Sequence, residues 1–235
     1  MAVHHKEKFL QRTWLKGLPP ATVDAVAKLA YFQPWPDGHR LFSRGDKPLA
    51  YFGVTTGAVR FTRANHAGKE MILDVAAPGT FFGEISILGD KGRGYDAQCL
   101  GDTLLLTVNA DDFHALFDRD EIFRRHVVKR MCARIDAYYD SFEDVLLLKL
   151  SARIAKRLLG LARAQQSLHG GSLVLDAGLS QENLASMFGI SRQSLNKYLV
   201  EWKERDWIEV QYGRIAIRDM HALQAVSEEH ESGRP

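Results

Sequence analysis

Four polar side chains close together in the chain have the chemistry that reading DNA bases requires: Arg192, Gln193, Asn196 and Lys197. An arginine can donate two hydrogen bonds to guanine, and a glutamine or asparagine can pair with adenine. A lysine can reach guanine or a phosphate. If the segment is helical, the four side chains lie on its outward face. We interpret them as candidate contacts in the major groove of double-stranded DNA.

Small residues occur at the points where a helix-turn-helix needs them. Counting from Gln181, Ala185 takes the fifth position, where two helices cross closely, and Gly189 the ninth, where the turn requires a positive φ. Ser191 follows the turn as an N-cap. The pattern predicts a second helix that starts at Ser191. The inward positions are apolar: Leu184, Phe188, Ile190, Leu195 and Tyr198.

The next segments predict a hairpin, and therefore a winged version of the motif. Residues Trp207–Gln211 and Arg214–Ile217 alternate apolar and polar side chains around Tyr212 and Gly213. Such a hairpin would lie beside the DNA backbone. Candidate phosphate contacts are the backbone amides at Ser180 and Ser191 and three cationic side chains, Lys203, Arg205 and Arg214.

Length and composition predict a folded protein of two domains. The chain has 235 residues, of which 46% are apolar, enough for two modest cores. No apolar run approaches the ~20 residues of a membrane span, and the first ten residues do not resemble a signal peptide. We expect a cytoplasmic protein without a membrane partner. Its small excess of basic residues lies between Lys149 and Asp219.

The two cysteines, Cys99 and Cys132, are far apart in the sequence, and each has apolar neighbours. This setting favours reduced, buried side chains over a disulfide or a metal site. We therefore expect no metal centre.

Glycines punctuate short alternating apolar runs from about Trp35 to Val108, which is typical of many short strands joined by tight turns. A β-roll or barrel of this size can hold one ligand in its interior. Helical segments are predicted on either side, around Ala21–Tyr31 and around Ala110–Phe117.

A long helix is predicted from Glu121 to Leu148. One apolar stripe follows the spacing of a coiled coil: Val128, Met131, Ile135, Tyr138, Phe142 and Val145. A second stripe contains Val127, Cys132, Tyr139, Leu146 and Leu147. Two apolar faces indicate that the helix packs on its own barrel and on a partner subunit. A two-fold homodimer would place two recognition helices about one DNA turn apart, so they could read a near-palindrome.

The predicted fold class is therefore α+β, with three parts in sequence order. An N-terminal cupin-like β-roll is assigned to residues 1–120, a dimerisation helix to residues 121–148, and a C-terminal winged helix-turn-helix to residues 149–235. The acidic, polar tail from Ser227 to Pro235 is expected to be disordered.

This order of elements resembles the Crp/Fnr family of bacterial transcription regulators over nearly the whole chain. Ser151–Leu159 resembles the family's inter-domain segment, Ile190–Ser194 its recognition-helix start, and Gly79–Glu84 followed by Arg93 its phosphate-binding cassette. In members that bind cyclic AMP, the glutamate of this cassette binds the ribose hydroxyl and the arginine binds the cyclic phosphate. The resemblance implies these roles for Glu84 and Arg93.

Other candidate effector contacts are Gly83 and Ile85, which with Glu84 form a helical turn with free amides, and Gly94, Tyr138 and Tyr139. The chain departs from the family at several of these points. Gly94 replaces a serine or threonine, and the loop before Arg93 is one residue shorter than in the best-known member. The two tyrosines replace a threonine and a serine that touch the adenine. The sequence leaves open a cyclic nucleotide (cAMP or cGMP), another small molecule, or no effector.

Gln193 also departs from the family, because it stands where a glutamate is usual. Glutamate accepts a hydrogen bond from cytosine and glutamine pairs with adenine, so the operator should differ from the familiar half-site. The proposed partners are DNA, a second copy of the chain and, for an activator, RNA polymerase.

Two other classes of function compete with DNA binding. A metal-dependent cupin enzyme needs clustered ligands that often begin with His-x-His, a pattern that does not occur in the sequence. The sequence also lacks a P-loop and a Gly-x-Ser-x-Gly elbow. A pure interaction module would give no purpose to Arg192, Gln193 and Lys197. We expect a regulator and no enzyme.

Overall fold

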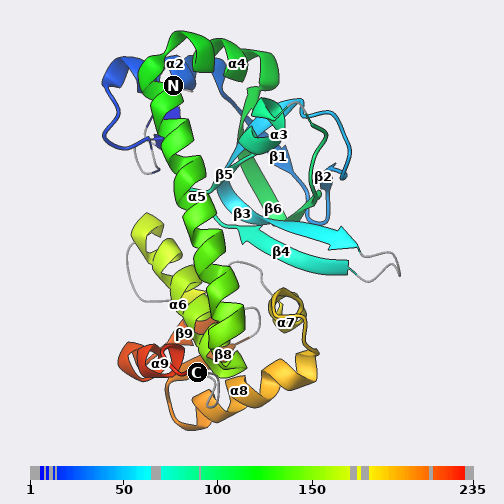
Figure 1. The fold of residues 1–235 in the computed structure, drawn as a ribbon, viewed down its shortest axis with the longest axis vertical. Helices are drawn as coiled ribbons and strands as arrows, with labels where there is room; N and C mark the ends of the chain where they lie inside the picture. The colour runs from blue at the N-terminus through cyan, green and yellow to red at the C-terminus, as the bar shows by residue number, and fades with distance from the viewer. Residues whose placement is uncertain are drawn as a thin grey trace. The chain divides into compact units, whose positions relative to one another are not determined.

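The computed structural model describes residues 6–7, 9–10, 13, 15–64, 70–89, 91–169, 174–175, 180–211 and 214–230. The chain divides into two compact units, Met1–Met131 and Cys132–Pro235, and each contains a sheet of its own (Figure 1). The predicted α+β fold class is confirmed: a β-roll, a long helix and a winged helix-turn-helix follow one another along the chain.

The first unit contains short helices, six strands and the start of the long helix. Its elements are α2 (Pro20–Leu29), β1 (Tyr31–Trp35), β2 (Arg40–Phe42), β3 (Ala50–Ala64), β4 (Glu70–Ala76), β5 (Phe81–Phe82), α3 (Glu84–Leu88), β6 (Asp96–Asn109), α4 (Ala110–Arg119) and α5 (Glu121–Leu147). The helix predicted at 21–31 ends at Leu29, because Ala30 takes an extended conformation and Tyr31 begins β1.

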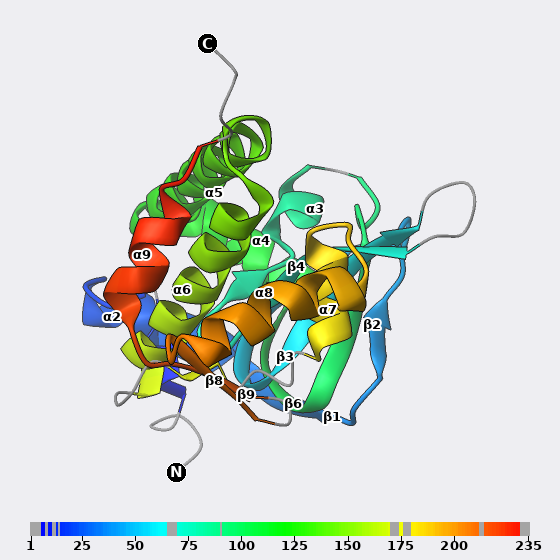
Figure 2. The ribbon, with the colours of Figure 1, turned by 90° about the horizontal axis from the view of Figure 1, so that it is seen from below.

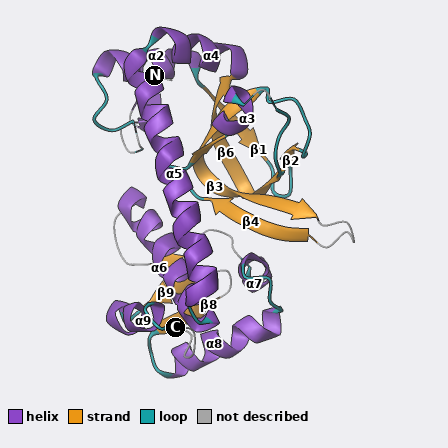
Figure 3. Cartoon of the chain, viewed as in Figure 1, coloured by secondary structure: helices purple, strands orange, loops and turns teal. Residues whose placement is uncertain are grey.

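Two long strands, β3 and β6, form the centre of the roll. They pair antiparallel from Ala50 opposite Asn109 to Thr62 opposite Asp96, with irregularities near Thr56. The sheet runs β1-β6-β3-β4, while β2 pairs with β6 and β5 pairs with β3 (Figure 3). Register shifts of this kind bend strands and let a sheet curl. The glycine-rich pattern from Trp35 to Val108 thus corresponds to curved, paired strands.

Alternating side chains of β3 supply two separate cores. Phe52 and Val54 point into the roll, where they pack with Phe42, Phe61 and Phe82. Tyr51 points to the opposite face and contacts Phe81 and Phe113, with ring centroids 5.5 and 4.9 Å apart. Strand geometry produces this division, since neighbouring residues face opposite sides of a sheet. The second core joins β5 to the helices α2, α4 and the start of α5.

The second unit is a small helical domain with a three-stranded sheet. Besides the end of α5, its elements are α6 (Leu150–His169), β7 (Val174–Leu175), α7 (Gln181–Met187), α8 (Arg192–Glu204), β8 (Ile208–Gln211), β9 (Arg214–Ile217) and α9 (Met220–Ser227). The strand order is β7-β9-β8. The core consists mainly of fully buried aliphatic residues from several helices, with Trp202 added: Ile154, Ala155, Leu158, Leu195, Leu199, Trp202 and Leu223.

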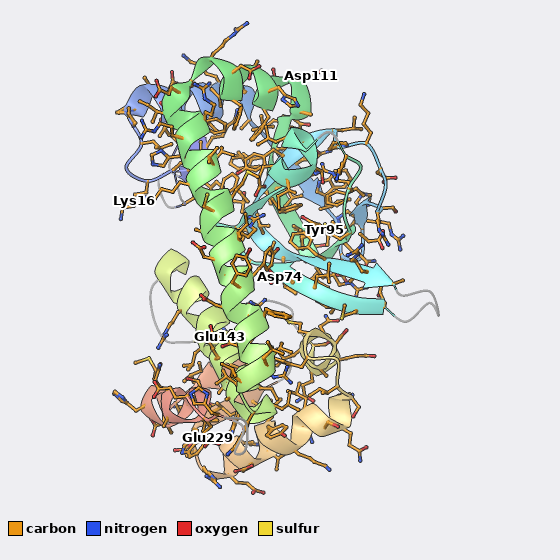
Figure 4. The ribbon with its side chains drawn as sticks, in the orientation of Figure 1. Lys16, Asp74, Tyr95, Asp111, Glu143 and Glu229 are labelled. Atoms are coloured by element: carbon orange, nitrogen blue, oxygen red, sulfur yellow. The ribbon has the colours of Figure 1, made fainter. Side chains whose placement is uncertain are left out.

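The predicted disorder of the tail is wrong for its first four residues. Ser227 ends α9, and the next residues return to the connection between α5 and α6. Leu148 and His230 form an antiparallel bridge, and the amide of Lys149 donates to the carbonyl of Glu229 at 3.2 Å. The ammonium of Lys149 pairs with the carboxylate of Glu229, which is labelled in Figure 4, at 3.1 Å. Residues 231–235 lie outside the described residues.

Candidate DNA-binding and effector sites

The turn between α7 and α8 has the geometry that the sequence predicted. Ala185 is 1% exposed, so the close crossing of the two helices leaves no room for a longer side chain. Gly189 has φ +66°, the left-handed region that favours glycine. The amides of Gly189 and Ile190 donate to the carbonyls of Ser186 and Ala185 and close the turn. Figure 2 shows α7 lying against α8.

Serine side chains cap both helices of the motif. Ser180 Oγ accepts from the amide of Asn183, and Ser191 Oγ accepts from the amide of Ser194, each at 3.1 Å. The N-cap predicted at Ser191 is therefore confirmed. Each cap fixes the first turn of its helix. In α8 the capped end is also the positive end of the helix dipole, which favours a nearby phosphate.

The four candidate base contacts share the exposed face of α8. The side chains that are buried on the opposite face are Leu195, Leu199 and Trp202. The side chains that are exposed include all four candidates: Arg192, Gln193, Asn196 and Lys197. Arg192 Nε donates one long hydrogen bond, 3.4 Å, to Gln181 Oε1 of α7. This face presents hydrogen-bond donors to solvent in positions that one groove of DNA could meet together.

The wing follows α8 as predicted, with β8 and β9 paired from Ile208 opposite Ile217 to Gln211 opposite Arg214. The turn predicted at Tyr212 and Gly213 lies outside the described residues. Glu209 accepts from Gln211 and pairs with Arg218, and these two interactions lower the pKa of its carboxyl.

Among the candidate phosphate contacts, Arg205 pairs with Glu201 at 2.8 Å and lies over the ring of Trp207. Its side chain therefore has partners within its own unit. Lys203 and Arg214 are exposed.

The predicted phosphate cassette forms around Gly83, at the junction of β5 and α3. Gly83 has φ +111°, and a Cβ there would lie 2.9 Å from Arg93 Nη1 and 3.0 Å from the carbonyl oxygen of Ala50. Both the conformation and the space therefore require glycine. The residues Gly83, Glu84 and Arg93, which were predicted to act together, do come together.

Arg93 is directed into the protein. Its guanidinium donates to the carbonyls of Ala50 at 2.6 Å and Gly83 at 3.3 Å, and lies 4.3 Å from the ring centroid of Phe42. Its Nε is buried without a hydrogen-bond partner. Burial lowers the pKa of Arg93, and the nearby Tyr95, Glu84 and Asp46 partly oppose that shift.

The aromatic side chains around Arg93 were not predicted from the sequence. Phe42 and Phe52 lie beneath the guanidinium, and Tyr95, labelled in Figure 4, packs on Phe42 and Phe61. Phe42 lies on β2, Phe52 and Phe61 lie on β3, and Tyr95 directly precedes β6, so only the fold brings them together. The interior that was expected to hold a ligand thus contains six aromatic side chains: Trp35, Phe42, Phe52, Phe61, Phe82 and Tyr95.

The backbone around Arg93 is held against the turn at residues 43–46. The amide of Arg93 donates to the carbonyl of Asp46, and the carbonyl of Arg93 accepts from the amide of Gly45, both at 2.8 Å. A Cβ at Gly92 would lie 2.5 Å from the carbonyl oxygen of Gly45, so the two segments touch. This contact fixes the position of Arg93 at the end of its loop.

Glu84 and Arg93 are each 3% exposed, so both charged side chains are buried. Ile85 and Gly94 are exposed beside them, and a Cβ at Gly94 would meet no atom within 4 Å. The remaining candidates, Tyr138 and Tyr139, belong to the second unit. They are exposed on α5.

The apolar stripes predicted on α5 are largely exposed in the single chain. Only Phe123 and Val127 of this helix are buried. The exposed apolar side chains are Ile122, Val128, Ile135, Tyr138, Tyr139, Phe142, Val145, Leu146 and Leu147.

The cysteines differ from each other. Cys99 is buried as expected, and burial raises the pKa of its thiol to about 11. The expected burial of Cys132 is wrong for the single chain, because it lies on the uncovered part of α5. Both are free thiols.

Within the described part of the chain, no group of three or more His, Cys, Asp or Glu side chains is arranged to hold a metal ion. Over the same residues, no helix has both the length and the apolar character needed to cross a membrane.

Two family models match separate parts of the chain. A cyclic nucleotide-binding domain matches residues 32–120, and a Crp-like helix-turn-helix domain matches residues 152–226. The first contains the cassette and the second contains the α7–α8 motif.

Relatives match over nearly their full lengths. A cyclic AMP receptor protein of Thermus thermophilus is 30% identical over 218 residues, which cover 90% of this chain and 94% of the relative. A CRP-like cAMP-activated global transcriptional regulator of Mycobacterium tuberculosis is 27% identical over 209 residues, covering 88% and 93%.

The fold also matches solved structures. A CRP/FNR family transcriptional regulator from Thermus thermophilus superimposes with a TM-score of 0.66 at 23% identity, covering 85% of this chain and 99% of that one. At this identity the likeness concerns the fold alone.

Proposed function

Because the chain belongs to the Crp/Fnr family of transcription regulators, we propose that it binds a near-palindromic DNA operator as a homodimer and responds to a small anionic effector. The proposed parts are residues 1–120 for effector sensing, 121–148 for dimerisation and 149–235 for DNA binding. The protein would act in the cytoplasm, where the DNA is, without enzymatic activity. For activation, it would also contact RNA polymerase.

The observation that best supports operator reading is the exposed polar face of α8 behind the Ser191 cap. We propose that Arg192, Gln193, Asn196 and Lys197 contact base edges, with the amides at Ser180 and Ser191 near phosphates. The test is selection of bound sequences from random duplexes, followed by binding titrations. Wild-type protein should enrich a two-fold symmetric site. Arg192→Ala should lose affinity for this site but keep the circular dichroism spectrum and the oligomeric state of the wild type. Retained affinity would refute the assignment.

Dimerisation through α5 is supported by its exposed apolar side chains, which a second copy would cover. Phe142→Asp should give a monomer, because a charge would then lie within the buried seam. Leu73→Asp, at an exposed leucine of β4, is the matched control and should leave the dimer intact. Light scattering after size-exclusion chromatography measures the molar mass of both variants in solution. A dimeric Phe142→Asp protein would place the interface elsewhere.

For the effector we propose a cyclic nucleotide, with Glu84 accepting from a ribose hydroxyl and Arg93 holding the phosphate. The arrangement fits such a ligand in part: Glu84 and Arg93 lie together, and the buried Nε of Arg93 has no hydrogen-bond partner. Nη2 and Nη1 each already donate one hydrogen bond, to the carbonyls of Ala50 and Gly83. Because Arg93 is only 3% exposed, a phosphate could reach its guanidinium only if the cassette rearranged.

Titration calorimetry with cyclic AMP and cyclic GMP tests this proposal. Binding that is lost in Arg93→Ala and partly kept in Arg93→Lys would support it. Absence of heat with both ligands, from protein that still binds its operator, would reject a cyclic nucleotide. A different small molecule or effector-free control would then remain.

A further inference from the structure

One apolar side chain interrupts the polar outward face of α8. Val200 is 42% exposed, and among the described residues of α8 it is the single apolar side chain that is exposed. The other large apolar residues of the helix are buried or half-buried. Val200 therefore does not belong to the core beneath the helix.

Helix geometry places Val200 on the same face as the candidate base contacts. It follows Gln193 by seven residues, which is about 20° short of two full turns, and lies one turn beyond Asn196 and Lys197. The rise from Gln193 is about 10 Å, or about three base pairs if the helix follows the groove. The side chain would thus meet the groove at a position that the four polar residues do not occupy.

Thymine is the base whose major-groove edge carries a methyl group. We propose that Val200 reads a thymine in each half-site by packing its isopropyl group against that C5 methyl group. This inference rests on the proposed operator binding and adds a specificity contact to it. The neighbouring polar side chains select bases by hydrogen bonds, whereas Val200 selects by burial of apolar surface, which is favourable only where the methyl group is present.

Fold stability gives no competing reason for valine at this position. A β-branched residue has lower helix propensity than alanine, leucine or lysine, and at 42% exposure the side chain is not part of the fully buried core of its unit. Val200→Ala should therefore keep the stability of the domain. Any loss of operator affinity in this variant then reports a contact with DNA.

The test pairs a methyl deletion in the protein with a methyl deletion in the DNA. Each thymine of the selected operator is replaced in turn by deoxyuridine, which lacks only the C5 methyl group, symmetrically in both half-sites. Affinities are measured by fluorescence anisotropy for the wild type, Val200→Ala and Val200→Thr, which keeps the shape but exchanges one methyl group for a hydroxyl. Glu204→Ala, an exposed substitution on the same helix, is the matched control.

At one thymine of each half-site, deoxyuridine should weaken wild-type binding about fourfold per half-site, the effect of one buried methyl group. Val200→Ala should bind thymine and deoxyuridine equally there. Glu204→Ala should keep the wild-type penalty. If every deoxyuridine penalty is the same in wild type and Val200→Ala, the proposed contact is wrong while operator binding stands. If selection enriches no sequence, the proposed function fails and this inference fails with it.

Discussion

The recognition helix and the phosphate cassette use the same kind of side chain in opposite ways. Arg192 of α8 is exposed and makes one long hydrogen bond to Gln181. Arg93 of the cassette is 3% exposed, bonded to two carbonyls and packed on Phe42. The first arginine is available to a ligand without any rearrangement. The second already contributes to the structure of its own unit.

On α8, the residues proposed to bind a ligand are distinct from those that stabilise the fold. In the cassette, the same residues would do both. On α8, the core face and the outward face hold different residues, so contacts with DNA can change without loss of the fold. In the cassette, the residues that would bind an effector also hold β5, α3 and the turn at 43–46 together. Any ligand there must offer more than the contacts it displaces.

The largest expected effect is the contrast between the two arginines in stability. Arg93→Ala should lower the free energy of unfolding by about 3 kcal/mol, since two carbonyls and Glu84 lose a buried cationic neighbour. Arg192→Ala should change it by less than about 0.5 kcal/mol, because the side chain is exposed. Urea unfolding followed by circular dichroism measures both values. Equal losses would break the comparison.

The two left-handed glycines give the next contrast. Gly83→Ala and Gly189→Ala both place a side chain at positive φ, which costs about 1 kcal/mol. At Gly83 the new Cβ would also crowd Arg93 and Ala50, whereas at Gly189 it meets no atom within 4 Å. We expect Gly83→Ala to be the more destabilising by about 1 to 2 kcal/mol. Thermal unfolding of the two variants under the same conditions measures this difference. A lower melting temperature for Gly189→Ala than for Gly83→Ala would contradict the predicted crowding at Gly83.

Gly94→Ser tests whether the cassette can gain a phosphate contact. The position is exposed, and the space around it accepts a Cβ. A hydroxyl there could donate to a bound phosphate, which should raise cyclic nucleotide affinity about tenfold or more. Gly94→Ala is the matched control, since it adds the carbon without the donor. Calorimetry that finds identical affinities for the two variants would remove Gly94 from the site.

The smallest expected effects come from the helix caps of the DNA-binding motif. Ser191→Ala should destabilise the second unit by about 1 kcal/mol, because the amide of Ser194 loses its acceptor. Ser191→Asp, which keeps a capping oxygen, should restore stability but weaken operator binding by repelling phosphate. Hydrogen exchange of the α8 amides and a DNA titration separate these outcomes. Unchanged exchange in Ser191→Ala would show that the cap is dispensable.

Local patterns carried most of the correct predictions. The helix-turn-helix depends on the spacing of Ala185, Gly189 and Ser191, which the sequence displays directly, and the structure confirms each of them. The strands, helices and wing also follow from periodicity. The roles of the candidate DNA and effector residues remain predictions.

Contacts between distant segments could not be read in the same way. The sequence near Arg93 does not predict its contacts with Phe42, Phe52 and the carbonyl of Ala50, because β-sheet pairing brings these distant residues together. Cys132 has apolar neighbours in sequence but none that cover it in the single chain. The polar composition after Ser227 predicted disorder, but main-chain hydrogen bonds hold the first residues of this segment without apolar burial.

The pairing of Leu148 and Lys149 with Glu229 and His230 brings together the two ends of the part of the second unit that follows α5. Where the entry and exit of a domain adjoin, the domain can be inserted into another protein or circularly permuted with little distortion. A fragment from 148 to 230 would keep this closure, while one that stops at the end of α9 would lose it. A chimaera that takes its N-terminal part from another protein should therefore be joined before Leu148. A partner fused to the C-terminal side should be attached after His230.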